Sequence, residues 1–110
     1  MDIQQISADF SVSSQIFEND LTAVKDAGFK GIICNRPDGE AADQPRFSKM
    51  ENAANEIGLA AIYVPVQPGA ASKKDVAAFR KALEDLESPV LAYCGSGMRS
   101  ASLWSLLYER

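Results

Sequence analysis

Residues 94–100, CGSGMRS, combine a nucleophile, a cation and two glycines at a spacing that suits anion-binding catalysis. Cys94 and Arg99 are separated by four residues, and Ser100 follows directly. Where a strand gives way to a helix, the amides of residues 95–99 turn inward around one point above the cysteine sulfur. Because the same positive potential lowers a thiol pKa, we expect Cys94 to be a nucleophile at neutral pH.

The residues around Cys94 are expected to bind the substrate. Arg99 should turn back over the loop, where its planar donors suit an oxyanion such as phosphate, sulfate or thiosulfate. Ser100 should donate to the thiolate and also cap the following helix. The expected substrate-binding residues are Gly95, Ser96, Gly97, Met98, Ser100 and Arg36. The competing interpretation makes Cys94 a small buried residue at a strand end and Arg99 a solvated cation.

Two residues near the other apolar run, GIICN, have alternative interpretations. Arg36 is either a second cation for the substrate or the ion-pair partner of Asp38 or Glu40. The position of Cys34 inside the run favours core packing, although a neighbouring strand would bring it within reach of Cys94 as a resolving thiol.

The composition restricts the chemistry that this chain performs. The sequence contains no histidine, which removes Ser-His and Cys-His pairs together with the commonest zinc ligand. We therefore expect no metal and no cofactor. The net charge of −4, without any long cluster of lysine and arginine, argues against nucleic acid as a partner.

The apolar runs, the first residues and the cysteine count predict where the protein acts. No apolar run approaches the roughly 20 residues of a membrane helix, and the first ten residues lack the basic and apolar regions of a secretion signal. Two cysteines are too few for a disulfide scaffold. We therefore expect a single domain over residues 1–110, in the cytoplasm and without membrane contact.

Apolar runs alternate with amphipathic segments along the chain, which predicts an α/β fold. Strands are expected at 9–13, 30–35, 60–66 and 90–94, and helices at 18–28, between Pro45 and Gly58, from Ser72 to Ser88 and at 100–110. This order implies a central, mostly parallel sheet of about four to five strands flanked by helices. Asn35, Gln67 and Cys94 should meet at its carboxyl edge, where ligands bind in such sheets.

The final helix is expected to keep an apolar face beyond the candidate site. Leu103, Trp104, Leu106 and Leu107 lie on it. We expect a partner, or a further segment of chain, to cover that face.

Three segments resemble the bacterial beta-lactamase-hydrolase-like, phosphatase-like family. They are AGFKGIICNRPDGE, GLAAIYVPV and PVLAYCGSGMRSASLW, and together they extend the resemblance over nearly the whole chain. The resemblance implies a fold similar to the dual-specificity protein phosphatases. It also implies that Cys94 is the nucleophile, that Arg99 binds the anion, and that Arg36 and Asp38 lie on a loop near the opening of the same site. Some members accompany persulfide dioxygenase-type enzymes, which implies a role in sulfur metabolism.

The sequence departs from the phosphatase pattern in the active loop. Phosphatases of that fold have five residues between cysteine and arginine, usually with histidine before the cysteine. Here four residues separate Cys94 from Arg99, and the preceding residue is Tyr93. The shorter spacing is similar to the active loop of rhodanese sulfurtransferases.

A second departure concerns the general acid. Dual-specificity phosphatases have an aspartate after the strand corresponding to IYVPV, whereas this chain has Gln67, Pro68 and Gly69 there. A phosphate ester gains about 100-fold or more from protonation of its leaving group. Asp38 is the candidate general acid, with Asp43 as another candidate, and both also suit a solvated turn.

These departures lead to a sulfurtransferase as the leading hypothesis. A Cys94 persulfide would pass sulfane sulfur from thiosulfate or a persulfide to an acceptor thiol such as glutathione, because sulfite and thiolates depart without an acid. The alternatives are a cysteine-dependent phosphatase of the dual-specificity type, acting on a phosphorylated substrate, and a non-catalytic module that binds anions or senses redox state.

Overall fold

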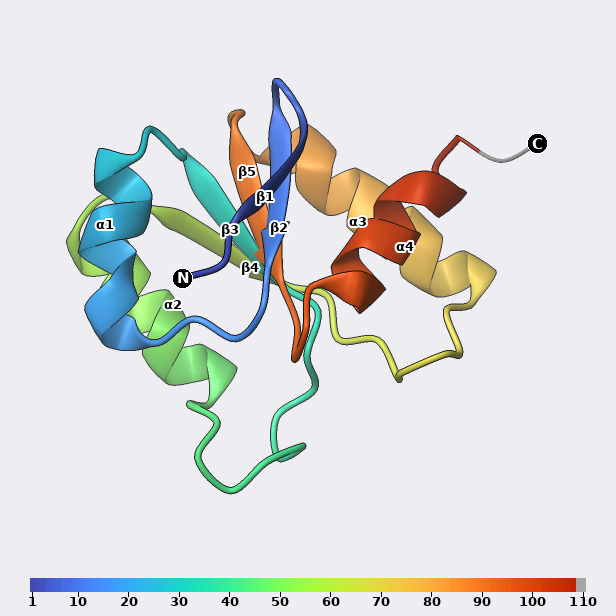
Figure 1. The fold of residues 1–110 in the computed structure, drawn as a ribbon, viewed down its shortest axis with the longest axis horizontal. Helices are drawn as coiled ribbons and strands as arrows, with labels where there is room; N and C mark the ends of the chain where they lie inside the picture. Colours follow the sequence, from blue (N-terminus) through green and yellow to red (C-terminus); the bar gives the residue numbers. More distant parts are fainter. Residues whose placement is uncertain (109–110) are drawn as a thin grey trace.

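A five-stranded sheet forms the centre of the molecule in the computed structural model, which describes residues 1–108 (Figure 1). Its strand order is β1-β2-β5-β3-β4, with bounds Gln4–Ser7, Phe10–Ser13, Val90–Tyr93, Gly31–Cys34 and Ala60–Tyr63. β1 pairs with β2 in the antiparallel direction, and the other neighbours are parallel. The predicted α/β fold with a mostly parallel sheet is therefore confirmed.

Strand β5 is the central strand of the sheet, and this position follows from its sequence. All four residues of β5, VLAY, are buried. A continuous apolar run of this kind is typical of a parallel strand that is covered on both faces. β5 pairs in register with both β2 and β3, so that Tyr93 lies beside Ser13 on one side and Cys34 on the other. The end of β5 thus delivers Cys94 to the middle of the carboxyl edge.

Helices cover both faces of the sheet (Figure 1). The 3₁₀ helix η1 (Glu18–Asp20), α1 (Leu21–Asp26) and α2 (Phe47–Glu56) lie on one face. α3 (Lys73–Asp85) and α4 (Met98–Leu106) lie on the other. Alternate strand residues serve the two layers, because successive strand side chains point to opposite faces. Leu91 and Tyr93 thus join the first core, whereas Val90 and Ala92 join the second.

The N-terminal strand was not predicted from the sequence. The expected order began with a strand at 9–13, whereas the structure adds β1 as an antiparallel edge strand. The residues of β1, QQIS, are mostly exposed and carry no apolar alternation. This strand therefore forms through pairing with β2, and the local strand propensity of its residues does not predict it.

Three other elements differ from their expected bounds. The helix expected at 18–28 is divided into η1 and the short α1, and the strand expected at 60–66 ends at Tyr63. Beyond Tyr63 the amides of Val64 and Val66 still donate to the carbonyl oxygens of Cys34 and Asn35, so Pro65 occupies a position whose amide would point away from β3. The helix expected at 100–110 begins earlier, at Met98, and its last two expected residues lie outside the described part of the chain.

The described helices are also informative about membranes. Within residues 1–108, none is both long and apolar enough to cross a bilayer.

Candidate functional site

The Cys94 sulfur lies in a tight turn between β5 and α4. Cys94 is 1% exposed, and the Gly97 amide donates to its sulfur at 3.0 Å. Gly97 adopts a left-handed backbone with φ of 91°, and an added Cβ there would lie 3.3 Å from the carbonyl carbon of Ser13. Both the positive φ and this close approach require glycine at position 97.

Backbone amides lower the pKa of the Cys94 thiol. Burial is the largest influence and acts to raise the pKa, but the amides of Ser100, Ser96, Gly97 and Arg99 together outweigh it. Hydrogen bonds to a thiolate favour the ionised form, and the N-terminal end of a helix adds partial positive charge. The Cys94 thiolate therefore forms at a lower pH than that of an ordinary cysteine.

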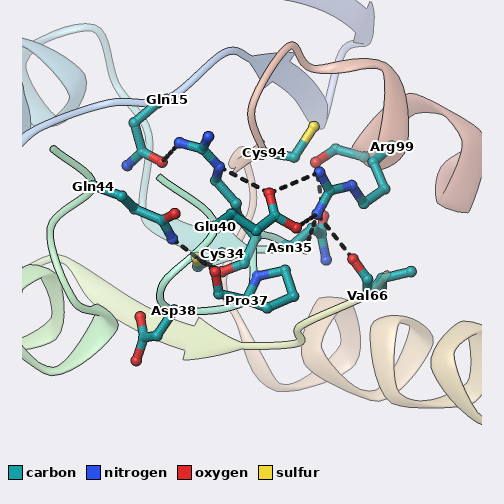
Figure 2. A network of polar contacts seen from close by, with 12 residues as sticks. Gln15, Cys34, Asn35, Pro37, Asp38, Glu40, Gln44, Val66, Cys94 and Arg99 are labelled. Atoms are coloured by element: carbon teal, nitrogen blue, oxygen red, sulfur yellow. Dashed lines mark hydrogen bonds and ion pairs between the residues drawn. The ribbon is translucent and has the colours of Figure 1, made fainter. Parts of the chain in front are cut away.

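Arg99 is anchored by two backbone carbonyls and one carboxylate (Figure 2). Its Nη1 donates to the carbonyl oxygens of Asn35 at 3.3 Å and Val66 at 2.9 Å. The same nitrogen lies 3.0 Å from Glu40 Oε2, and Nη2 lies 3.2 Å from Glu40 Oε1. A guanidinium fork held in this way has a fixed orientation at the carboxyl edge of the sheet.

Arg36 lies against the same loop. Its Nε forms an ion pair with Glu40 Oε1 at 3.0 Å, and its Nη1 donates to Gln15 Oε1 at 3.0 Å. A Cβ added to Gly95 would lie 3.6 Å from Arg36 Nε, so the guanidinium packs directly on the turn that follows Cys94. Of the alternatives left open by the sequence, the ion pair with Glu40 is formed, and Arg36 also borders the site.

Glu40 connects the two arginines and is the residue that sequence reasoning missed as part of the site. Its carboxylate accepts from both Arg36 and Arg99, and its side chain is 22% exposed. Burial acts to raise the pKa of Glu40, yet the two guanidinium groups outweigh it and lower that pKa. The spacing of four residues from Arg36 was the available sequence signal, whereas nothing local connected Glu40 with Arg99.

Ser100 acts differently from its expected role. Its hydroxyl donates to Asn35 Oδ1 at 2.8 Å, and both residues are fully buried. Asn35 in turn donates through Nδ2 to the Val64 carbonyl at 2.9 Å. The expectation that this hydroxyl serves the thiolate or caps α4 is corrected, because it joins α4 to the ends of β3 and β4 instead. The Ser100 amide, in contrast, helps to lower the pKa of Cys94.

Asp38 lies apart from Cys94. Its Oδ1 accepts from the Phe47 amide at 2.8 Å, and its own amide donates to the Tyr63 hydroxyl at 2.9 Å. Figure 2 shows its carboxylate pointing away from Cys94. The side chain stabilises the start of α2, so the structure does not bring this candidate acid to the nucleophile. Asp43, the other candidate, is exposed on the same loop.

Cys34 belongs to the core on the α1 and α2 face. It is 2% exposed, packs in the same cluster as Tyr93, and donates to the Arg36 carbonyl oxygen at 3.3 Å. Burial raises the pKa of the Cys34 thiol. A buried thiol of raised pKa is a poor nucleophile, so this environment fits the core-packing interpretation.

A cavity of about 510 Å³ opens beside Arg99. It lies between the segment 66–71 and the start of α4, where Ser96 and Met98 line it. Met98 is 74% exposed, and its amide donates to Ser96 Oγ at 3.3 Å. Residues 1–108 contain no group of three or more His, Cys, Asp or Glu side chains positioned to hold a metal ion.

Comparison with protein families and curated relatives gives consistent matches. The family model described as "Beta-lactamase hydrolase-like protein, phosphatase-like domain" matches residues 2–109. A beta-lactamase hydrolase-like protein of Xylella fastidiosa is 34% identical over 106 residues, which cover 96% of this chain and 25% of that protein. The chain thus spans about a quarter of the length of the curated relatives it matches.

Solved structures show the same relationship. A candidate phosphatase from Neisseria meningitidis matches with a TM-score of 0.86 and 35% identity, covering 94% of this chain and 74% of that one. The core catalytic domain of a PP-IP phosphatase from S. cerevisiae matches with a TM-score of 0.69 and 17% identity, covering 94% and 62%. The second likeness concerns the fold alone, which is that of protein tyrosine phosphatase-like domains.

Proposed function

The chain belongs to the family of beta-lactamase hydrolase-like proteins, phosphatase-like domain, and on that premise we propose that it is a cysteine-dependent phosphatase with Cys94 as its nucleophile. The observation that carries this proposal is the Cys94 sulfur at the N-terminus of α4, where the Gly97 amide donates to it at 3.0 Å. The candidate phosphatase of 35% identity supports the same reaction class.

The proposed reaction has two steps. The Cys94 thiolate attacks phosphorus, the bond from phosphorus to the leaving oxygen breaks, and a phosphocysteine forms. The amides of residues 96–100 and the Arg99 guanidinium would hold the negative oxygens of the transferred group. Water then attacks the phosphocysteine, which releases inorganic phosphate and regenerates the thiolate.

The test of this proposal is hydrolysis of aryl phosphates by the purified chain. We expect phosphate release, inhibition by vanadate, and a mass gain of one phosphoryl group on Cys94 after rapid quenching. Cys94→Ser should lose both turnover and the mass gain. Absence of turnover on several aryl phosphates and phosphopeptides would contradict the proposal.

Sulfane-sulfur transfer is the second candidate, and two observations favour it. Cys94 and Arg99 are separated by four residues, and Asp38 is bound to the Phe47 amide instead of facing the nucleophile. In this reaction the thiolate attacks the outer sulfur of thiosulfate, the S–S bond breaks and sulfite leaves, which requires no acid. Glutathione thiolate would then take the sulfur from the Cys94 persulfide and regenerate the Cys94 thiolate.

A parallel assay separates the two candidates. Thiosulfate should add one sulfur to wild-type Cys94 if the second candidate holds, and glutathione should remove it with formation of glutathione persulfide. Phosphate release without a sulfur adduct favours the phosphatase. Anion binding with neither activity would favour a non-catalytic binding module.

We also propose that the protein acts in the cytoplasm. Cys34 and Cys94 are both free thiols, and a catalytic thiol stays reduced in a reducing compartment such as the cytoplasm. Fractionation of cells that express the full natural protein tests this location, and recovery outside the cytoplasmic fraction would contradict it.

A further inference from the structure

The charges at the candidate site are balanced before any substrate binds. The Cys94 thiolate and the Glu40 carboxylate are negative, and the Arg36 and Arg99 guanidinium groups are positive. Glu40 contacts both arginines at 3.0 Å. The nearby Asp38 carboxylate instead accepts from the Phe47 amide. The two cations that would attract an anion are therefore already neutralised within the site.

Within this balance, Glu40 acts against a doubly charged substrate. Because Coulomb energy is proportional to the ligand charge, the Glu40 carboxylate repels a phosphate ester dianion with twice the energy with which it repels a monoanion, and so offsets the larger attraction that the two arginines exert on the dianion. The two side chains are partly shielded from solvent, with 13% exposure for Arg99 and 22% for Glu40, so solvent screens the repulsion in part.

The source of the proton for the leaving group also favours a monoanionic substrate. A phosphate ester requires a proton on its leaving oxygen unless the leaving group is a weak base. Asp38 faces away from Cys94 in Figure 2, and the two arginines hold Glu40 as a carboxylate with a lowered pKa. A monoanionic ester carries its own proton on a phosphoryl oxygen, so it needs no acid from the protein.

We propose that Glu40 makes this site selective for singly charged phosphoryl substrates, namely the monoanions of phosphate monoesters. The inference rests on the phosphatase function proposed above. In the transfer step the Cys94 thiolate bonds to phosphorus and the phosphoryl proton moves to the departing oxygen as the P–O bond breaks. An alcohol leaves, and the phosphocysteine dianion retains both negative charges. Water then releases monoanionic phosphate and the thiolate.

Anion binding tests the role of Glu40 without requiring turnover. In a Cys94→Ser background, the dissociation constants of sulfate and methanesulfonate compare a dianion with a monoanion of similar shape. Adding Glu40→Gln should tighten methanesulfonate binding roughly threefold and sulfate binding roughly tenfold, because the relieved repulsion doubles with ligand charge. Glu56→Gln, an identical change at an exposed position near the end of α2, should leave both constants unchanged.

One outcome of the binding comparison would overturn the proposal. Equal or weaker sulfate binding in Glu40→Gln would mean that Glu40 orients Arg99 without selecting charge. A single cooperative thermal unfolding transition establishes that the variant is folded. If the variant does not fold, the kinetics of the wild-type protein decide the proposal.

Turnover provides the second measurement. With wild-type protein, kcat/KM for an aryl phosphate should fall by about tenfold per pH unit once the pH exceeds both the second pKa of the substrate, about 6, and the pKa of Cys94. Two aryl phosphates with different second pKa values should show correspondingly shifted profiles, which a titrating protein group would not produce. A kcat/KM that persists as the dianion forms would contradict selection of the monoanion. If no aryl phosphate is hydrolysed, the phosphatase function fails, whereas the anion-binding comparison still decides the role of Glu40.

Discussion

Arg99 and Glu40, 59 residues apart in the sequence, form a two-point ion pair in which Nη1 lies 3.0 Å from Oε2 and Nη2 lies 3.2 Å from Oε1. This pair fastens the loop after β3 to the first turn of α4. It also places a carboxylate beside the guanidinium groups of a site that otherwise favours anions.

Cys94 and Cys34 should differ in reactivity toward iodoacetamide. Amides of the turn lower the Cys94 pKa despite its burial, whereas burial raises the Cys34 pKa. Since the thiolate is the reacting form, Cys94 should be alkylated first, and its rate should rise at a lower pH than the value of about 8.5 for a free thiol. Peptide mass analysis over a pH series measures both sites. Faster labelling of Cys34 in the folded protein would contradict this assignment.

The contribution of Glu40 to stability should depend on pH. Its folded pKa is lowered by Arg99 and Arg36 against the effect of burial, so its stabilisation is present above the unfolded pKa and disappears as pH falls through the folded pKa. At pH 7, Glu40→Gln should lower the free energy of unfolding by up to about 1 kcal/mol, a modest value because the pair is partly solvated. Urea unfolding at pH 7 and pH 3 checks this, with the two proteins converging at the lower pH. A constant difference would show that the carboxylate charge is not responsible.

Gly97→Ala should damage both stability and the site. A left-handed alanine costs about 1–2 kcal/mol, and its Cβ would approach the Ser13 backbone at 3.3 Å. The turn must shift to relieve this contact, which moves the Gly97 amide away from Cys94. Gly28→Ala is the matched control, because Gly28 also has a positive φ but open space around it. Urea unfolding and Cys94 alkylation should show a larger loss in Gly97→Ala, and equal effects would exclude the role of the Ser13 contact.

Asp38→Asn should leave turnover within about threefold of wild type. The Asp38 carboxylate accepts from the Phe47 amide, and an asparagine oxygen can accept the same bond. Asp38→Ala should instead destabilise the start of α2, by about 1 kcal/mol. Aryl phosphate kinetics and urea unfolding measure the two effects separately. A loss of 100-fold or so in kcat for Asp38→Asn would restore this residue as the general acid.

The sequence was sufficient to predict the fold class, for local reasons. Continuous apolar runs and amphipathic segments alternate, and each pattern depends only on residues a few positions apart. The same is true of the turn after β5, because the residues from Cys94 to Ser100 are contiguous and glycine tolerates the backbone that position 97 adopts. β1 escaped prediction because its mostly exposed residues form a strand only through pairing with β2.

The tertiary structure alone decided what faces Cys94. Sequence patterns report which residues are buried, but they do not report the direction in which a polar side chain finds its partner. Ser100 turns to Asn35, Asp38 turns to the Phe47 amide, and Glu40 reaches across the sheet edge to Arg99. The Ser100–Asn35 bond is buried, and there an unpaired group would cost about 1–3 kcal/mol. Those partners lie far apart in the chain, so only the packed sheet brings them within reach.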